Sequence, residues 1–200
     1  EVVDSMGGGI CQVSTTLYNA VLRAELNVTE RSPHSMTVHY VDLSEDAAIA
    51  GTYKDFKFVN STEYPIYIEG YTTSDKKITF NIYGKETRDK NRTISFESQM
   101  VSETPATTIL QEDAGQGIGY KAVSSKGSSG YVAELYKIVK VNGVETDRIK
   151  VNKSTYKGTN RVVTYGTAGD PTLSENLRAA IAAQDEALAD ANIAAAVPAQ

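Results

Sequence analysis

The segment GGGICQVSTTLYN, residues 7–19, is the most informative part of this sequence. Three successive glycines open it, and their backbone can adopt conformations that other residues avoid. From Cys11 onward, apolar residues recur at helical spacing on one face. These residues are Val13, Leu17, Val21 and Leu22, with Ala20 and Ala24 beside them. The pattern predicts a helix of about four turns over residues 11–26, entered through a tight glycine loop.

Cys11 is the only cysteine, and the predicted helix places it in the first turn. A thiol there meets backbone N–H groups and the positive end of the helix dipole, and both favour the thiolate. The unpaired amides of the helix start can also hold a developing oxyanion, and Gln12 can add a side-chain donor. The alternative is that Cys11 is a small residue packed where nothing larger fits.

A cysteine nucleophile needs a base, and the sequence has two histidines, His34 and His39. If residues 34–41 form a strand, the two imidazoles point to opposite faces, so at most one reaches Cys11. A carboxylate would then orient that imidazole. The candidates for this acid are Asp42, Asp46 and Asp55. Transglutaminase-like and papain-like hydrolases use the same order of groups, which is an analogy of arrangement. The alternative is that the histidine after Pro33 is a turn residue.

Beyond Asn27, short apolar runs alternate with turn residues. The runs lie near residues 36–41, 56–58, 66–68 and 78–82, and the turns include residues 60–62 and 73–75. This pattern is typical of short β-strands. Residues 1–92 are therefore expected to form one helix packed on an antiparallel sheet, in an α+β fold.

The charged residues 85–92 predict a domain boundary, and residues 93–169 have a β pattern throughout. Val141-Asn142-Gly143-Val144 predicts a hairpin turn. Frequent glycines predict an elongated, thin all-β module. GQGIG at residues 115–119 lacks a following helix, which favours a turn or bulge over a nucleotide site. Exposed tyrosines of this module can stack on sugars, and they are Tyr120, Tyr131, Tyr136, Tyr156 and Tyr165.

Residues 170–200 are rich in alanine, with apolar residues at roughly helical spacing. Thr172 and Ser174 are candidate N-caps. Because large apolar residues are few, a flexible tail is the alternative to a C-terminal helix.

The composition excludes several classes of protein. A net charge of −5 without a basic patch argues against nucleic acid as a partner. One Cys and two His offer no zinc-type spacing, so neither a metal nor another cofactor is expected. No apolar run is long enough to span a bilayer. The chain begins at Glu1 with a strand-like apolar pair, so we expect a signal or anchor upstream.

The segment GGGICQVSTTLYNA at residues 7–20, followed by ERSPHS at residues 30–35, resembles the signature of the VanW family. The similarity continues through residues 40–41, 46–47, 55–58 and 65–68, so it covers about residues 1–85. It implies that residues 1–92 hold a C-terminal part of that domain, truncated at its N-terminus. The positions that match the family motif are Cys11, Gln12, Ser14, His34, Asp46 and Asp55. His39 lies outside the motif, which favours His34 as the base.

Residues 93–169 are similar to the five-glycine (G-five) domain of bacterial surface proteins, through residues 127–130, 141–145 and 165–167. The two resemblances imply an exported protein at the cell surface or wall of a Gram-positive bacterium. They also imply contact with peptidoglycan or another polymer containing N-acetylglucosamine. The VanW family takes its name from vancomycin-resistance gene clusters, which implies a link to glycopeptide resistance.

Two functions follow from these observations. The first is a non-catalytic protein that binds wall glycan, in which Cys11 and His34 only pack the helix. The second is a thiol hydrolase or acyl transferase acting on peptidoglycan peptides, with Cys11 as nucleophile, His34 as base and Asp46 or Asp55 as the orienting acid. We favour the first slightly, because a thiol nucleophile outside the cell is exposed to oxidation.

Overall fold

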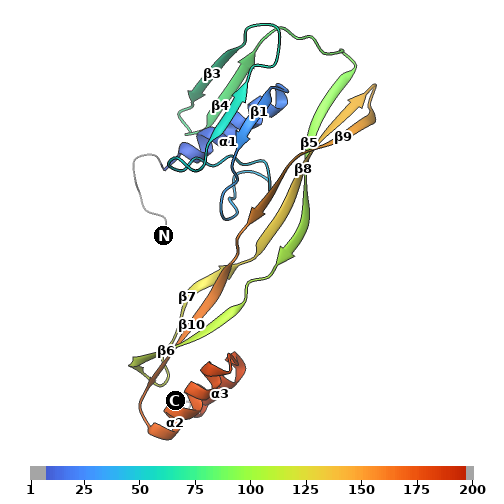
Figure 1. The fold of residues 1–200 in the computed structure, drawn as a ribbon. Helices are drawn as coiled ribbons and strands as arrows, with labels where there is room; N and C mark the ends of the chain where they lie inside the picture. The colour runs from blue at the N-terminus through green and yellow to red at the C-terminus, as the bar shows by residue number, and fades with distance from the viewer. Residues whose placement is uncertain (1–7, 197–200) are drawn as a thin grey trace. The chain divides into compact units, whose positions relative to one another are not determined.

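The computed structural model describes residues 8–196, which form two compact units (Figure 1). The first unit is Glu1–Ser102 with Tyr131–Tyr156, and the second is Glu103–Gly130 with Lys157–Gln200. Both units therefore contain strands of the predicted β module, and its division between them was not expected. Gly7 and the strand-like start at residues 1–4 lie outside the described residues. The predicted domain bounds remain a prediction.

Helix α1 spans Ile10–Arg23 and confirms the helix predicted from the apolar spacing. Gly9 is its N-cap residue and provides no side-chain cap. The buried face includes Tyr18, Val21 and Leu22. The helix ends where Glu25 adopts a φ of 56°, a left-handed conformation that stops helical hydrogen bonding.

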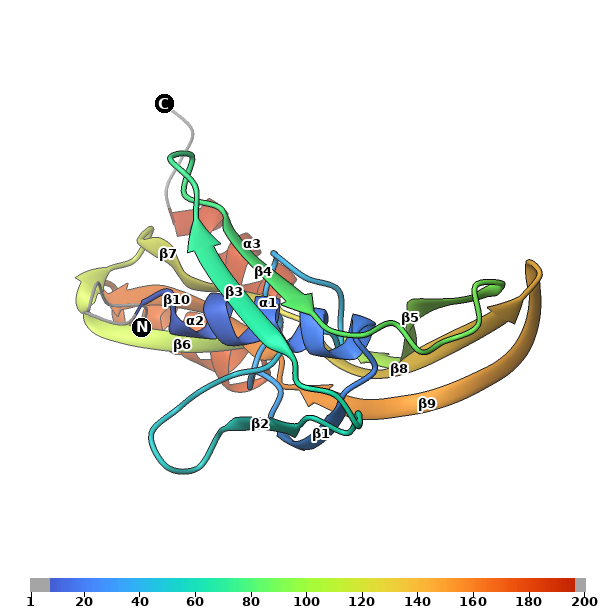
Figure 2. The same cartoon turned by 90° about the horizontal axis from the view of Figure 1, so that it is seen from above.

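Four short strands of the first unit pair as two separate antiparallel hairpin-like sheets. Strand β1, Asn27–Arg31, pairs with β2, Phe56–Val59, and β3, Tyr67–Thr72, pairs with β4, Ile78–Tyr83. The expectation of one sheet beneath one helix is therefore not confirmed. Helix α1 contacts β4 along the hairpin β3–β4 (Figures 1 and 2).

The predicted strand near residues 36–41 was wrong, because residues 32–49 form an irregular loop. Backbone groups of this loop form hydrogen bonds with side chains of α1, and not with the backbone of a neighbouring strand. Ala47 N donates to Thr15 Oγ1 at 3.0 Å, and Ala47 O accepts from Ser14 Oγ at 2.6 Å. Asn19 Nδ2 donates to Glu45 O at 2.7 Å. Polar side chains of the helix thus satisfy the backbone that a sheet would otherwise satisfy.

The largest sheet of the first unit has the order β5-β8-β9, with β5 at Arg92–Thr104, β8 at Gly130–Val141 and β9 at Val144–Tyr156. Asn142 and Gly143 join β8 to β9 with φ values of 53° and 81°, which confirms the predicted hairpin turn. Leu135 of β8 is fully buried in one core with Tyr18, Leu22 and Ala47. The helix of the N-terminal region and strands of the β module therefore share a hydrophobic core.

The second unit contains a sheet of order β6-β10-β7 and two helices. Its strands are Thr108–Gly117 (β6), Lys121–Ser128 (β7) and Thr159–Ala168 (β10), and β10 runs parallel to β6 and antiparallel to β7. GQGIG forms the end of β6 and the turn after it, as predicted, with a φ of 107° at Gly119.

The C-terminal region is helical over its described residues. Helix α2 spans Pro171–Ala182 and α3 spans Glu186–Ala196. Asp170 is the N-cap of α2 and accepts from two backbone amides, so the expected caps Thr172 and Ser174 were wrong. Leu177 and Ile181 pack against Val163 and Tyr165 of β10. Within residues 8–196, no helix is both long and apolar enough to cross a membrane.

Candidate functional site

Cys11 lies in the first turn of α1, as the sequence predicted, and its side chain is partly buried. Its Sγ donates to the carbonyl oxygen of Ile49 at 3.5 Å. Gly9 precedes the helix, and a Cβ added there would meet no atom within 4 Å. The thiol therefore forms a hydrogen bond with a backbone carbonyl of the loop at residues 32–49, as Ser14 and Thr15 also do.

Asp46 is the centre of this loop, and its side chain is only 1% exposed. Its Oδ1 accepts from Arg31 Nη2 at 2.7 Å and from the Tyr156 hydroxyl at 2.6 Å. Its Oδ2 accepts from the backbone N of His34 at 2.6 Å and from His34 Nδ1 at 2.7 Å. The carboxylate thus has four hydrogen bonds, to groups on β1, β9 and the loop itself.

These bonds determine the ionisation of Asp46. Burial acts to raise its pKa, because a buried charge loses its hydration. The hydrogen bonds from the His34 side chain and backbone, the bond from Tyr156 and the charge of Arg31 outweigh burial and hold the pKa of Asp46 below its usual value. The carboxylate is ionised at neutral pH.

The imidazole of His34 is oriented by this carboxylate. With Nδ1 donating to Asp46, the neutral ring has Nε2 as its free acceptor. The Tyr40 hydroxyl lies 3.4 Å from Nε2. Burial raises the pKa of Tyr40, while a hydrogen bond with Thr15 lowers it and negative charge on Cys11 would raise it. Tyr40 therefore lies between the imidazole and the first turns of α1.

The other predicted site residues lie apart from this cluster. Asp55 Oδ1 accepts a hydrogen bond from the backbone N of Phe56, and Asp55 Oδ2 forms an ion pair with Lys57 Nζ at 3.4 Å. Asp55 makes no hydrogen bond to His34. The side chains of Gln12 and His39 are exposed. Within residues 8–196, no hydrogen bond joins Cys11 to His34, although both lie in one region of the first unit.

Sequence reasoning missed Arg31, Tyr40 and Tyr156. Arg31 also donates to Asp46 O at 2.6 Å and to Ser154 Oγ at 2.7 Å. Tyr156 was expected among exposed tyrosines, but it is buried and its hydroxyl also accepts from Ser44 N at 2.7 Å. The argument that His34 and His39 lie on opposite faces of a strand was wrong, because the segment is a loop. The one available signal was that Arg31 lies within the ERSPHS segment.

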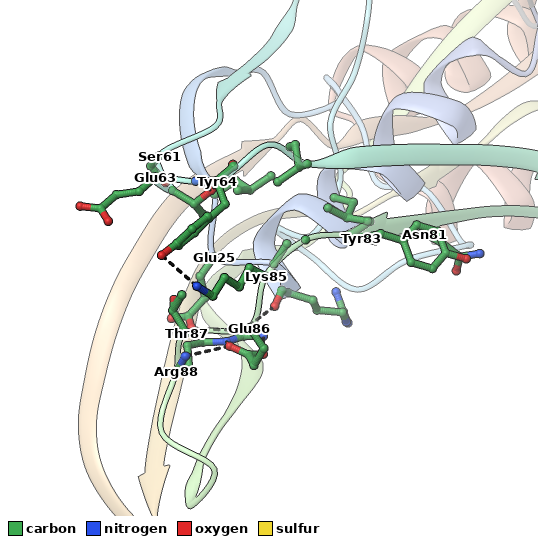
Figure 3. A pocket seen from close by; sticks show the side chains of 18 of the residues that line it. Glu25, Ser61, Glu63, Tyr64, Asn81, Tyr83, Lys85, Glu86, Thr87 and Arg88 are labelled. Carbon is green, nitrogen blue, oxygen red and sulfur yellow. Dashed lines mark hydrogen bonds and ion pairs between the residues drawn. The ribbon is translucent and has the colours of Figure 1, made fainter.

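The part of the chain that the structure describes contains no cluster of three or more His, Cys, Asp or Glu that could hold a metal ion. A pocket of about 900 Å³ lies elsewhere in the first unit, beside the C-terminal end of α1 (Figure 3). Its wall includes Tyr64, whose ring lies 4.1 Å from Lys85 Nζ. Neither Cys11 nor His34 lines this pocket.

Comparison with known families defines the two regions. Residues 1–83 match the VanW like protein family, and residues 96–168 match the G5 domain. Both domains predicted from the sequence are therefore found, in the predicted order. One detail was wrong: the VanW-like region is N-terminal in this chain, and the match does not support describing it as a C-terminal part. Together the two domains fit a protein of the cell surface or cell wall.

The chain also resembles individual proteins. The uncharacterized protein YoaR of Bacillus subtilis (strain 168) is 46% identical over 68 residues, which cover 34% of this chain and 22% of YoaR. The chain thus spans about a fifth of that relative.

Two solved structures resemble parts of the chain. The IgA1 protease G5 domain has 24% identity and a TM-score of 0.30, covering 42% of this chain and 100% of that domain. The crystal structure of HP0197-G5 has 20% identity and a TM-score of 0.24, covering 38% of this chain and 97% of that one.

Proposed function

We propose that this protein acts at the cell surface by binding peptidoglycan or a related glycan polymer, without turning it over. The observation that carries this proposal is the buried network around Asp46, in which all four hydrogen bonds of the carboxylate are made within the protein. A catalytic imidazole must exchange a proton with its nucleophile or substrate. No hydrogen bond joins His34 to Cys11 within residues 8–196, and the bonds of Asp46 and His34 instead connect β1, the 32–49 loop and β9. The G5 match supports a polymer as the ligand.

The environment of Cys11 supports the same proposal. An activated thiol needs a base within hydrogen-bond reach. Here the Sγ donates to a backbone carbonyl, Ile49 O, and the imidazole bonds Asp46 and faces Tyr40. Arg31, whose side chain is 6% exposed, compensates the buried carboxylate, which is the usual arrangement of a structural ion pair.

Co-sedimentation with purified, insoluble peptidoglycan tests the proposal. The folded chain is expected to pellet with the polymer in 0.5 M NaCl, where screening suppresses purely charge-driven adsorption. Soluble glycan strands should release it. The heat-unfolded chain, kept below its aggregation threshold, is the control. Recovery of the folded chain in the supernatant at every polymer concentration would refute the proposal.

A second candidate function is a thiol hydrolase or acyl transferase acting on peptidoglycan peptides. The observation in its favour is the 2.7 Å bond between His34 Nδ1 and Asp46, the geometry of an oriented general base. In this candidate Asp46 would be the orienting acid in place of Asp55, and Gln12 in the first turn of α1 would be the additional oxyanion donor. The test is the rate of Cys11 alkylation by iodoacetamide across pH, in the native chain and in His34→Ala. A reactive thiolate that depends on His34 would favour this candidate, and an inert thiol would exclude it.

Surface location through an upstream signal or anchor, and the link to glycopeptide resistance, belong to the same proposal. Both follow from the VanW-like and G5 matches and from wall binding as the activity. Deleting residues 1–168 from the natural protein should lower its retention on cell walls. A change in vancomycin susceptibility on deletion would support the resistance link, and unchanged susceptibility would count against it.

A further inference from the structure

The hairpin β3–β4 has two chemically different faces. In its antiparallel register, alternate residues of the two strands lie on the same side. The inner face contains Phe80 and Ile82, which line the pocket at the end of the helix together with Ala20 and Ala24 of α1. Asn81 and Tyr83, from the other face of β4, also contribute to the pocket lining. The outer face consists of Tyr67, Glu69, Tyr71, Thr79, Asn81 and Tyr83. We call these six residues the tyrosine face.

Three aromatic rings of the tyrosine face are exposed. Tyr67 is 65% exposed, Tyr71 46% and Tyr83 52%. Tyr67 and Tyr83 are directly opposite in the register, with ring centroids 6.0 Å apart and planes inclined by 31°. Tyr71 lies four residues along β3, about 13 Å away at the usual rise of a strand. The rings therefore extend over more than one sugar unit of a chain.

Polar groups lie between these rings. The Glu69 carboxylate accepts from Asn81 Nδ2 at 2.9 Å and from the Tyr83 hydroxyl at 3.1 Å, both through Oε2. These bonds fix the carboxylate and the carboxamide in place, and Asn81 and Tyr83 project from the same strand (Figure 3). Asn81 Oδ1 and Glu69 Oε1 have acceptor capacity for hydroxyl or acetamido N–H groups, and Asn81 can donate its second amide hydrogen to a carbonyl.

The two strands of the hairpin pack closely against each other on the inner face. A Cβ at Gly70 would lie 2.5 Å from Phe80 Cε1, so the missing side chain at this position lets the Phe80 ring pack across β3 on the inner face. Pre-ordered rings and polar groups lose little conformational freedom on binding. The bonds of Glu69 to Asn81 and Tyr83 provide such order on the outer face.

The charge of the face defines its ligand further. Among its six residues, Glu69 is the only charged one, and none is a lysine or arginine. A phosphate-rich or carboxylate-rich polymer would be repelled by Glu69 and would find no cation there. A neutral polymer of hydroxylated rings complements the face, because its flat apolar ring surfaces can lie on tyrosines while its polar groups bond Glu69 and Asn81.

We propose that the tyrosine face of the VanW-like region binds the sugar rings of a neutral N-acetylhexosamine chain. Tyr67 and Tyr83 would contact one ring, Tyr71 a ring further along, and Glu69 with Asn81 the acetamido and hydroxyl groups between them. This inference rests on the proposed wall-glycan function and deepens it, because it assigns binding to the N-terminal region in place of the G5 module.

The test is isothermal titration of the whole chain with the N-acetylglucosamine tetramer, comparing wild type with Tyr67→Ala, Tyr83→Ala and Tyr71→Ala. Each alanine variant should weaken binding by about tenfold, the effect of removing a central aromatic contact. Tyr67→Phe and Tyr83→Phe keep the ring and should bind within about threefold of wild type. Tyr53→Ala is the matched control, because Tyr53 is 76% exposed but lies outside this face.

The outcomes separate the two proposals. Wild-type affinity in all three alanine variants, with unchanged circular dichroism spectra, would overturn the tyrosine face while leaving wall binding intact. Equal loss in Tyr53→Ala would also overturn it, since the effect would not be specific to the face. Failure of wild type to bind either the tetramer or insoluble peptidoglycan would refute both proposals. Binding to peptidoglycan but not to the tetramer would overturn the tyrosine face alone.

Discussion

Replacing Asp46 by Asn removes the charge at the centre of the buried network and keeps nearly the same volume. Asp46 neutralises Arg31, whose side chain is 6% exposed, so the variant leaves a buried guanidinium uncompensated. It also replaces one of two acceptor oxygens by an amide donor, which opposes either the Arg31–Tyr156 pair or the two His34 donors. Breaking a buried ion pair from one side costs about 3–5 kcal/mol.

This loss is a large share of the roughly 5–15 kcal/mol by which a typical domain is stable. The assay is urea denaturation followed by circular dichroism, with hydrogen exchange measured by mass spectrometry in α1 and β9. Exchange should accelerate in both segments, because Asp46 joins them through the loop and Tyr156. Asp55→Asn is the control: Asp55 is 46% exposed and should change stability by less than about 0.5 kcal/mol. A loss below about 1 kcal/mol in Asp46→Asn would refute the reasoning.

Three further predictions concern pH, an ion-pair cluster and a turn. Because the pKa of Asp46 is lowered in the folded state, its contribution to stability is complete above the unfolded-state value of about 4 and is lost as the pH falls below it. Wild type should therefore lose melting temperature as the pH falls below about 4, and Asp46→Asn should lose less; equal losses would contradict this. Glu25, with a pKa lowered to about 2 chiefly by the hydrogen bond from Arg92 and also by Lys137, links the end of α1 to β5 and β8. Glu25→Gln should cost about 1–3 kcal/mol in urea denaturation, and no change would show that the cluster is only a surface feature. Gly143→Ala places a Cβ at a φ of 81° and should cost about 1 kcal/mol, whereas an unchanged melting curve would mean that the turn can relax.

Features that depend on neighbouring residues could be predicted from the sequence. The apolar spacing from Val13 to Leu22 repeats within one helix, and Asn142-Gly143 specifies a two-residue turn through φ alone. Cys11 was correctly placed in the first turn because the glycines before it and the helical spacing after it define that turn. Each of these predictions depended only on residues that lie close together in the sequence, within about four helical turns.

Features that depend on distant residues could not be predicted. The apolar residues near 36–41 alternate as in a strand, but the backbone of this loop bonds Ser14, Thr15 and Asn19 of α1. Asp46 meets Tyr156 across 110 positions of sequence, and nothing in the local pattern distinguishes that tyrosine from an exposed one. The sequence likewise could not show which of three nearby aspartates orients His34. The fold places Asp46 beside His34 and leaves Asp55 on the surface.

Binding without catalysis is tested by incubating the chain with purified peptidoglycan and measuring two quantities together, the bound protein and the sugar or peptide fragments released. Mass spectrometry of the supernatant detects release, and the pelleted protein reports binding, for wild type and for Cys11→Ser. We expect equal binding by both and no release by either. Fragments that appear with wild type and are absent with Cys11→Ser would contradict this, because the chain would then be a cysteine-dependent enzyme.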